Sequence, residues 1–378
     1  MTRIQVEVRF LPFLFLPIVA SGFYLYSPHL VEPLLYQANL DGLAATTTLI
    51  DMPTQKEIVS HLSTPEPLYA IYMTGWVAGN KTFRNSLVEL IDDTELNAVI
   101  IDIKDYTGEL LAEERAPDIK DFVKSLHDKG IYVIGRVSAF QDLKLTKERP
   151  DLAVRRSSDG EVWKDKKGIS WLDPGSSEVW EYLVEIGETY YELGFDELNF
   201  DYIRFPSDGN MRDIAYNFFD ESIQTKPDLM REFFQYLHER LASTTEAHPV
   251  LSADLFGMTT TNTDDLNIGQ LLENAIPYFD YIMPMVYPSH YPPNFSGYAN
   301  PADVPYEIIK FSMDRAVSRL EAASSSSLKL RPWLQDFNLG ATYDAEMVRN
   351  EMQAVYDSGL TSWALWSPSN RYTRQAID

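Results

Sequence analysis

Three aspartates lie at or near the ends of short apolar runs, where a carboxylate is costly unless it is paired or used. Asp102 follows the run AVII, Asp201 follows ELNF, and Asp254 interrupts the run VLSADL. Two carboxyl groups that face one bond can hydrolyse a glycoside, because one protonates the leaving oxygen while the other attacks the sugar or activates water. These three aspartates are therefore the candidate catalytic residues.

The neighbours of Asp201 and Asp254 predict different protonation states for the two carboxyl groups. Asn199 shares the strand face of Asp201 and Arg204 follows shortly after, and both would favour the ionised form. Asp254 has mainly apolar neighbours, which should raise its pKa and keep it protonated. We expect Asp201 to be the nucleophile or base and Asp254 the acid, with Asp102 in reserve. A purely structural role for each carboxylate stays open.

Further polar and aromatic side chains near the ends of the runs could bind substrate. Lys104 and Asp105 follow Asp102, and alternation places Lys104 on the face of Asp102. Arg136 stands near the end of the next run, where we expect it to pair with an aspartate of the preceding run or to bind a substrate hydroxyl. Each aromatic candidate could equally belong to the core. The remaining candidates for substrate contact are Asn199, Arg204, Trp76, Trp171, Tyr287, His290, Gln335 and Trp366.

Alternating strands and helices are the elements that must position these side chains. Amphipathic segments separate short apolar, β-rich runs, and one of them, Ser176–Leu193, begins with a capping serine and is followed by Gly194. This alternation predicts βα units and a parallel sheet. The eight runs are Leu68–Met73, Ala98–Ile103, Ile131–Val137, Glu197–Phe200, Val250–Leu255, Tyr281–Val286, Leu330–Leu334 and Ser362–Trp366.

Eight such units over residues 68–378 predict an α/β protein with a (β/α)8 TIM barrel, whose active site lies at the carboxyl ends of the strands. A doubly wound sheet is the competing fold, and it would carry a glycine-rich first turn for a nucleotide. The first turn here, TGWVAGN, lacks the GxGxxG spacing, which favours the barrel. Few residues follow the last run, so we expect the eighth helix to be short or missing.

Residues 1–31 predict a signal peptide or a membrane anchor. Arg3 and Arg9 precede an uncharged, largely apolar stretch that extends to Val31, and its length lies between those of a signal peptide and a spanning helix. A buried structural segment is the third option. With an anchor or a signal, the folded part is membrane-anchored facing outside, or secreted. Residues 32–67, with several prolines and mixed polarity, predict a linker or lead-in segment.

Composition excludes several classes of function. The formal charge is −24 and no run of Lys or Arg occurs, so nucleic acid is not an expected partner. The chain has no cysteine, which rules out disulfides, zinc–thiolate sites and iron–sulfur clusters. GxSxG, HExxH and P-loop motifs are absent and the histidines are scattered, so neither a metal nor a cofactor is expected.

Several motifs, taken in order, resemble a known family. They are YMTGW, VIIDIKDYTGEL, GRVSAFQD, GFDELNFDYIRFPSDG, MPMVYPSHY and SWALWSPSN. Together they are similar to a bacterial and archaeal family of glycoside hydrolase domains, which belongs to the TIM-barrel glycosidases and is distantly alpha-amylase-like and chitinase-like. The resemblance covers residues 68–372. It implies a glycosidase barrel, with Asp201 at the nucleophile position and Asp254 where a proton donor is expected.

Two departures limit what the resemblance implies for the mechanism. Chitinase-like barrels carry D-x-x-D-x-D-x-E in the fourth strand, and this chain has Asn199 at the second acidic position and Ile203 at the place of the proton-donating Glu. Amylase-like barrels carry an Arg two residues before the nucleophile, and Asn199 stands there instead.

These features together predict a glycoside hydrolase that cleaves glycosidic bonds of an envelope or environmental polysaccharide or oligosaccharide. Two carboxylates at the barrel mouth would carry out the reaction. The alternative is a catalytically inactive, glycan-binding envelope protein, which would keep the aromatic residues but need neither Asp201 nor Asp254. Deacetylation of a polysaccharide would require a His/Asp metal set that the sequence does not offer.

Overall fold

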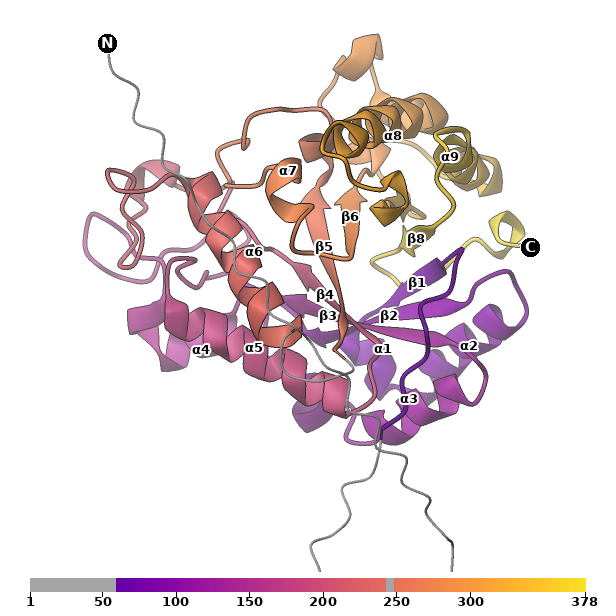
Figure 1. The fold of residues 1–378 in the computed structure, drawn as a ribbon, viewed down its shortest axis with the longest axis horizontal. Coiled ribbons are helices and arrows are strands. Elements are labelled where there is room, and N and C mark those ends of the chain that lie inside the picture. Colours follow the sequence, from indigo (N-terminus) through magenta and orange to yellow (C-terminus); the bar gives the residue numbers. More distant parts are fainter. Residues whose placement is uncertain (1–58, 243–247) are drawn as a thin grey trace, which may run out of the picture. The chain divides into compact units, whose positions relative to one another are not determined.

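In the part of the chain that the structure describes, eight parallel strands close into a barrel, and β8 pairs with β1 (Figure 1). The computed structural model describes residues 59–242 and 248–378. The closed strand order excludes the doubly wound sheet and confirms the predicted barrel. The strands are β1 (Tyr69–Met73), β2 (Ala98–Lys104), β3 (Tyr132–Ser138), β4 (Glu197–Asp201), β5 (Val250–Phe256), β6 (Tyr281–Met285), β7 (Trp333–Gln335) and β8 (Trp363–Trp366).

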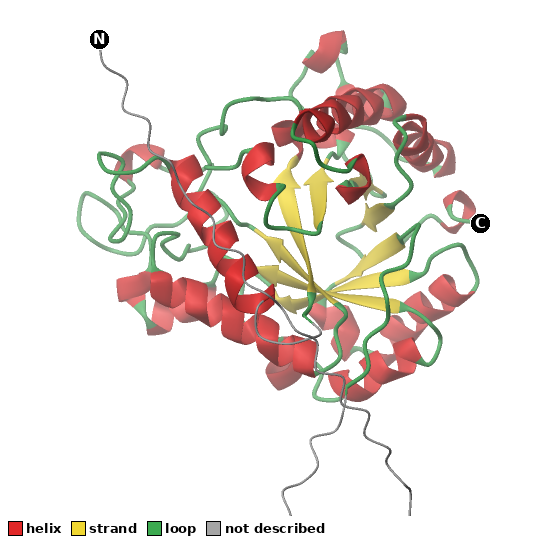
Figure 2. Cartoon of the chain, in the orientation of Figure 1, coloured by secondary structure: helices red, strands yellow, loops and turns green. Residues whose placement is uncertain are grey.

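Helices surround the barrel (Figure 2). The predicted helix that begins after Ser176 is α5, in which the Ser176 hydroxyl accepts a hydrogen bond from the backbone N–H of Val179. Gly194 follows that helix with a positive φ of 109°, the conformation that glycine tolerates at a helix end. The helices are α1 (Gly75–Gly79), α2 (Lys81–Asp92), α3 (Ile119–His127), α4 (Leu143–Glu148), α5 (Ser177–Glu192), α6 (Lys226–Ala242), α7 (Leu272–Ala275), α8 (Pro305–Ala322) and α9 (Ala345–Asp357).

Alternation along the strands divides the apolar residues between two cores. Ile100 of β2 belongs to the core inside the barrel, together with Met283 and Trp333. Val99 and Ile101, on either side of Ile100, belong to the core between the strands and the helices. Toward the carboxyl ends of the strands the buried residues become polar, and these residues are Asp102, Arg136, Asn199, Asp201 and Asp254.

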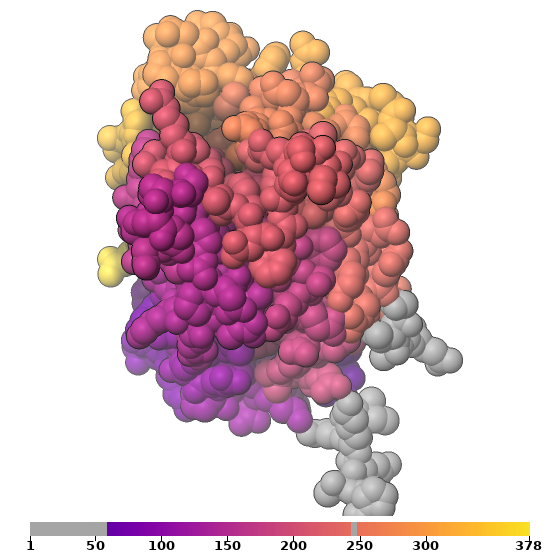
Figure 3. All heavy atoms as spheres, turned by 90° about the vertical axis from the view of Figure 1, so that its left-hand side faces the viewer, coloured from indigo at the N-terminus to yellow at the C-terminus, as the bar shows by residue number. Residues whose placement is uncertain are grey.

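Two long connections extend the barrel beyond the carboxyl ends of β3 and β4. The first covers residues 139–176 and the second residues 202–225. An antiparallel bridge pairs Arg155 of the first with Ala215 of the second, so the two connections lie against each other. Figure 3 shows their atoms side by side on one face of the molecule.

Residues 59–67 close the amino-terminal end of the barrel. The backbone N–H of Leu62 donates to the Asp196 carboxylate at 2.7 Å, and the Thr64 hydroxyl lies 3.1 Å from the Tyr132 hydroxyl. The Leu62 side chain packs against the core inside the barrel. This part of the predicted lead-in segment is therefore packed against the barrel.

The predicted anchor or signal, residues 1–31, lies outside the described residues, as does most of the lead-in segment 32–67. Within the ranges that the structure describes, no helix has the length and apolar character needed to cross a membrane. After β8 the described chain forms only a short 3-10 turn, Arg374–Ala376, in place of an eighth helix. This agrees with the expectation of a short or missing helix.

Candidate active site

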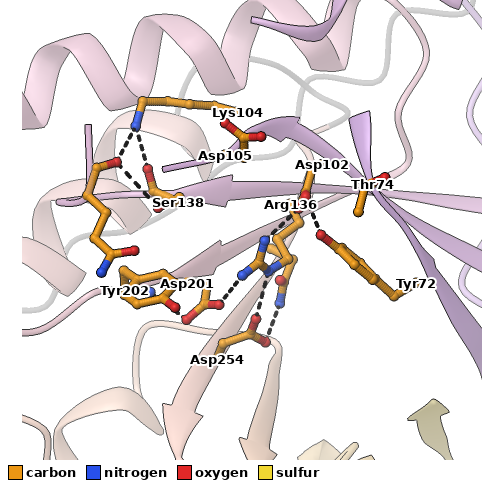
Figure 4. Close-up of polar contacts among 12 residues, drawn as sticks. Tyr72, Thr74, Asp102, Lys104, Asp105, Arg136, Ser138, Asp201, Tyr202 and Asp254 are labelled. Atoms are coloured by element: carbon orange, nitrogen blue, oxygen red, sulfur yellow. Dashed lines mark hydrogen bonds and ion pairs between the residues drawn. The ribbon is translucent and has the colours of Figure 1, made fainter. Parts of the chain in front are cut away.

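Arg136 of β3 lies among carboxylates from three other strands, as Figure 4 shows. Its Nη1 donates to Asp102 at 2.5 Å, its Nη2 donates to Asp201, and its Nε lies 3.5 Å from Asp254 Oδ2. Asp201 and Asp254 contact the same guanidinium group, so they lie within the limit of about 10 Å for two catalytic carboxyl groups. The structure thus brings the three predicted aspartates together at the carboxyl ends of the strands.

Burial alone would lower the pKa of Arg136, but the carboxylates of Asp201 and Asp102 outweigh that effect and raise it. Arg136 therefore carries a full positive charge. Within the described ranges, no group of three or more His, Cys, Asp or Glu side chains is arranged to hold a metal ion. The guanidinium of Arg136 balances negative charge among the three aspartates.

Asp254 is the most deeply buried of the three carboxylates, with an exposed fraction of 1%. Its Oδ1 accepts hydrogen bonds from Trp333 Nε1 at 2.7 Å and from Asn199 Nδ2 at 2.9 Å. Burial and the nearby Asp201 carboxylate raise the pKa of Asp254 to about 8, against the opposing effect of Arg136. Asp254 is therefore mainly protonated at neutral pH, as its apolar sequence neighbours predict.

Asp102 has a second hydrogen-bond partner in Tyr72 of β1, whose hydroxyl donates to Asp102 Oδ2. The Tyr72 ring stacks on Trp366 of β8, with ring centroids 4.0 Å apart. Burial raises the pKa of Asp102, and the opposing effects of Arg136 and Tyr72 offset it only in part. Asp102 is thus a second carboxyl group that holds its proton more tightly than usual.

Asp201 ends β4 and has a hydrogen-bond donor on each carboxylate oxygen. Oδ2 accepts from Arg136, and Oδ1 accepts from the backbone N–H of Tyr202 at 2.5 Å. Tyr202 has a φ of 53°, a left-handed conformation that side-chain-bearing residues seldom adopt and that is concentrated at functional sites. The backbone after β4 thus holds the Asp201 carboxylate in place at the end of the strand.

A cavity of about 550 Å³ opens beside these residues, a size typical of small-ligand sites. Asp201 and Asp254 contact Arg136 but do not line the cavity themselves. The predicted site residues that line it are Trp76, Asp102, Asp105, Arg136 and Trp366. The lining residues that the sequence did not single out are Tyr72, Thr74, Tyr106, Ser138, Gln141, Lys167, Ile169, Tyr202 and Pro368.

The prediction missed two important site residues, Tyr72 and Trp333. Tyr72 donates a hydrogen bond to Asp102, and Trp333 donates one to Asp254. Both are aromatic residues within strands, and such residues usually belong to a core. A signal existed for Tyr72, which belongs to the YMTGW motif at the end of the first strand. Trp333 stands in the short strand β7, and nothing in that strand indicates a carboxylate partner.

Lys104 does not reach the cavity, contrary to the prediction. Its side chain is fully buried and donates to the backbone oxygens of Ser138 at 2.6 Å and Gln141 at 3.1 Å. It also forms an ion pair with Asp142 at 3.0 Å. The pairing of β2 with β3 shifts register between Asp102 and Lys104, so simple alternation fails there. Figure 4 shows Lys104 pointing away from Arg136.

Asn199 supports Asp254 rather than Asp201, so the predicted pairing with Asp201 is wrong. Its Nδ2 donates to Asp254 and also to the Ser252 hydroxyl at 3.0 Å. Asn199 lies beside Ser252 in the pairing of β4 with β5, and its side chain therefore reaches the neighbouring strand.

Three other predicted contacts belong to the packing around the cavity rather than to its wall. The guanidinium of Arg204 lies 5.0 Å from the ring centroid of Trp171. Trp171 is buried, and its Nε1 donates to Asp165 at 3.2 Å. Gln335 is fully buried, and its side-chain oxygen accepts from the hydroxyl of Ser289 at 2.7 Å.

Tyr287 and His290 form an aromatic group beside the cavity. The Tyr287 ring is buried, and its centroid lies 5.3 Å from that of the His290 ring and 6.4 Å from that of the Trp366 ring. His290 is exposed. Neither residue lines the cavity; Tyr287 packs near the wall residue Trp366, and His290 packs near Tyr287.

A parallel (β/α)8 barrel with carboxyl groups at the carboxyl ends of its strands is the arrangement of a TIM-barrel enzyme, and glycosidases are one class that uses it. Over residues 70–372 the chain matches the family described as "Putative glycosyl hydrolase domain". The chain belongs to this family of glycosyl hydrolase domains. No curated protein matches it.

Similar solved structures include a hypothetical protein from Ruminiclostridium thermocellum, which is 35% identical, with coverage of 49% of this chain and 96% of that one and a TM-score of 0.43. The PgaB (BpsB) glycoside hydrolase domain from Bordetella bronchiseptica is 14% identical. The match covers 82% of this chain and 98% of that domain, with a TM-score of 0.59. An alpha-galactosidase from Thermus thermophilus is 14% identical. The match covers 82% of this chain and 60% of that enzyme, with a TM-score of 0.51. The last two likenesses support the barrel fold.

Proposed function

We propose that the chain hydrolyses glycosidic bonds of an oligosaccharide or polysaccharide, using the carboxyl groups around Arg136. One observation carries the proposal: carboxyl groups from three strands converge on one guanidinium at the carboxyl end of the barrel, beside a cavity with aromatic residues in its wall. Barrel enzymes take their catalytic residues from the ends of several strands. Glycoside hydrolysis needs carboxyl groups in different protonation states, and family membership supports the same reaction.

Asp201 is the nucleophile or general base in this proposal. It ends β4, at the position where the resemblance implies a nucleophile. Amylase-like barrels have an Arg two residues before that nucleophile, where this chain has Asn199. Arg136 lies beside Asn199 in the pairing of β3 with β4 and brings a guanidinium to Asp201 from the neighbouring strand.

Asp102 is better placed than Asp254 to donate the proton. Asp102 lines the cavity, whereas Asp254 does not, and Asp254 Oδ1 accepts hydrogen bonds from Trp333 and Asn199. The pKa of each carboxyl group is raised by burial. We therefore assign Asp102 as the general acid and Asp254 as a neutral, buried group beside Arg136. This assignment reverses the order of the two acids expected from the sequence.

A catalytically inactive glycan-binding protein is the second candidate, and one observation favours it. Arg136 engages the carboxylate of Asp201 as well as those of Asp102 and Asp254, so the Asp201 carboxylate is committed to an ion pair within the protein. A binding protein would use the aromatic side chains of the cavity and would need none of the three carboxylates.

We further propose that the barrel acts outside the cytoplasm, anchored to the cell membrane or secreted. The predicted anchor or signal in residues 1–31 supports this location. An envelope or environmental polysaccharide is the substrate that such a location makes available.

Incubation of the full chain with a panel of polysaccharides tests the proposed function. The wild-type chain should release new reducing ends from at least one polysaccharide. Asp201→Asn should still bind that polysaccharide but release no reducing ends. Binding by the wild-type chain without hydrolysis would favour the second candidate. Neither binding nor hydrolysis across the panel would contradict both candidates.

A further inference from the structure

Trp76 is an exposed aromatic side chain on the wall of the cavity. It belongs to α1, directly after β1, and has an exposed fraction of 67%. Among the large apolar side chains that the structure describes, only that of Ile223 is more exposed. Single exposed apolar side chains are common, but one that lies on a cavity wall offers its ring face to a ligand. Trp76 lines the same cavity as Asp102 and Arg136.

Arg115 fixes the orientation of the Trp76 ring. The guanidinium lies 3.5 Å from the ring centroid and so covers one face of the indole. The Arg115 side chain is itself 4% exposed, forms an ion pair with Glu109, and lies 3.8 Å from Asp105. A ligand that stacks on the ring therefore meets a side chain whose rotamer freedom is already restricted, which lowers the entropy cost of binding.

Glycines allow the close packing that places Trp76. A Cβ at Gly79 would lie 2.5 Å from the backbone oxygen of Arg115, and a Cβ at Gly75 would lie 3.2 Å from that of Asp102. Residues Leu111–Arg115 form a single π-helical turn, an uncommon structure that is concentrated at functional sites. The local chain is thus specialised to press α1 against Arg115, with Trp76 directed to the surface.

We propose that Trp76 is a distal sugar subsite, which binds a pyranose ring of an oligosaccharide at a distance from the bond that is cleaved. This inference rests on the proposed function. Trp366, stacked on Tyr72, belongs to the part of the cavity near Arg136. Trp76 instead packs on Arg115, which lies 3.8 Å from Asp105, and both Asp105 and Thr74 line the cavity and can accept hydrogen bonds from sugar hydroxyls. The substrate class is then a chain of several sugars rather than a single terminal sugar.

Chain-length dependence of binding tests the distal subsite. The probes are fragments of two to about six sugars, prepared from the polysaccharide that the wild-type chain cleaves in the panel. Kd is measured in full-length Asp201→Asn, alone and combined with Trp76→Ala, Trp76→Phe or Phe218→Ala. Phe218 is the matched control, because it is also exposed but lines a different cavity.

We expect Trp76→Ala to weaken binding of the longest fragments by about 3- to 10-fold and to leave the Kd of the two-sugar fragment unchanged. Trp76→Phe should retain most of the affinity, and Phe218→Ala all of it. Equal Kd values for all fragment lengths, or equal weakening of short and long fragments by Trp76→Ala, would overturn the distal subsite while the proposed function stands. Failure of the panel to yield any cleaved polysaccharide would overturn both.

Discussion

At the scale of single residues, the candidate site depends on how one guanidinium is shared among three carboxyl groups. If Asp102, Asp201 and Asp254 were all ionised, Arg136 could not balance their charge in buried surroundings. Burial raises the pKa of Asp102 and of Asp254, and the proton that Asp254 retains at neutral pH relieves this imbalance. The difference in protonation is what separates a general acid from a nucleophile within one small group.

Replacement of Asp254 by Asn should change how stability depends on pH. Folded Asp254 keeps its proton up to a pH of about 8, whereas in the unfolded chain it ionises near its ordinary value of about 3.9. Between these values the folded state holds a proton that the unfolded state has released, so the free energy of unfolding falls as pH rises.

Asp254→Asn imitates the neutral carboxyl group and should remove that slope. Urea denaturation should find the variant similar to the wild-type chain near pH 4 and more stable near pH 8, by on the order of a few kcal/mol. Parallel pH profiles for the two chains would show that Asp254 is not protonated in the folded state.

Replacement of Lys104 by Met should destabilise the fold, because Lys104 forms a buried ion pair with Asp142. An unpaired buried charge costs about 3–5 kcal/mol. Adding Asp142→Asn to Lys104→Met should recover part of that loss, since it removes the unpaired charge. Denaturant unfolding checks both, and a loss below about 1 kcal/mol for Lys104→Met would contradict the structural role.

The sequence identified the carboxylates of the site better than their partners. A carboxylate in an apolar run is a strong signal in one strand, so Asp102, Asp201 and Asp254 could be selected without a structure. Asn199 was assigned to Asp201 because the two share a strand, yet its side chain binds Asp254 on β5. Contacts between strands depend on the register of the sheet, which one strand's sequence does not reveal.

At the scale of elements, regular alternation predicted the eight strands, and local irregularities escaped prediction. The register shift in β2 is one of these. The packing of residues 59–67 against the barrel is another, because it depends on a few distant hydrogen bonds rather than on a repeating pattern. The buried carboxylate of Asp196 accepts from the backbone N–H groups of Leu62 at 2.7 Å and Val133 at 2.8 Å, and lies 3.0 Å from His127 Nε2.

Asp196→Ala should therefore release residues 59–67 and lower the stability of the barrel. The loss of several hydrogen bonds to buried donors predicts a decrease of about 2–4 kcal/mol in the free energy of unfolding. The control is Asp128→Ala, which removes an exposed carboxylate paired with Lys124 and should change stability by less than about 0.5 kcal/mol. Equal thermal unfolding of the two variants would contradict the role given to Asp196.

At the scale of the whole molecule, an acidic chain with a formal charge of −24 combines an enzyme-like barrel with an apolar amino-terminal stretch. The barrel was predictable because its strands repeat, whereas the fate of residues 1–31 depends on a length that lies between those of a signal and an anchor. The proposed location outside the cytoplasm therefore needs its own test.

Fractionation of cells that express the full chain provides that test. We expect the chain in the membrane fraction or in the medium, and we expect a variant that lacks residues 1–31 in the cytosolic fraction, because the apolar stretch is what directs export. Recovery of the full chain from the cytosol would contradict the proposed location.

The most direct test of the central claim is the turnover number of Asp201→Asn on the polysaccharide that the wild-type chain cleaves. The account predicts a decrease in kcat of at least about 1,000-fold, with a Kd within about threefold of the wild-type value. Asp220→Asn is the matched control, since Asp220 is exposed and lies outside the site, and it should retain wild-type turnover. A variant Asp201→Asn that hydrolyses the polysaccharide at the wild-type rate would show that Asp201 is neither the nucleophile nor the general base, which contradicts the account.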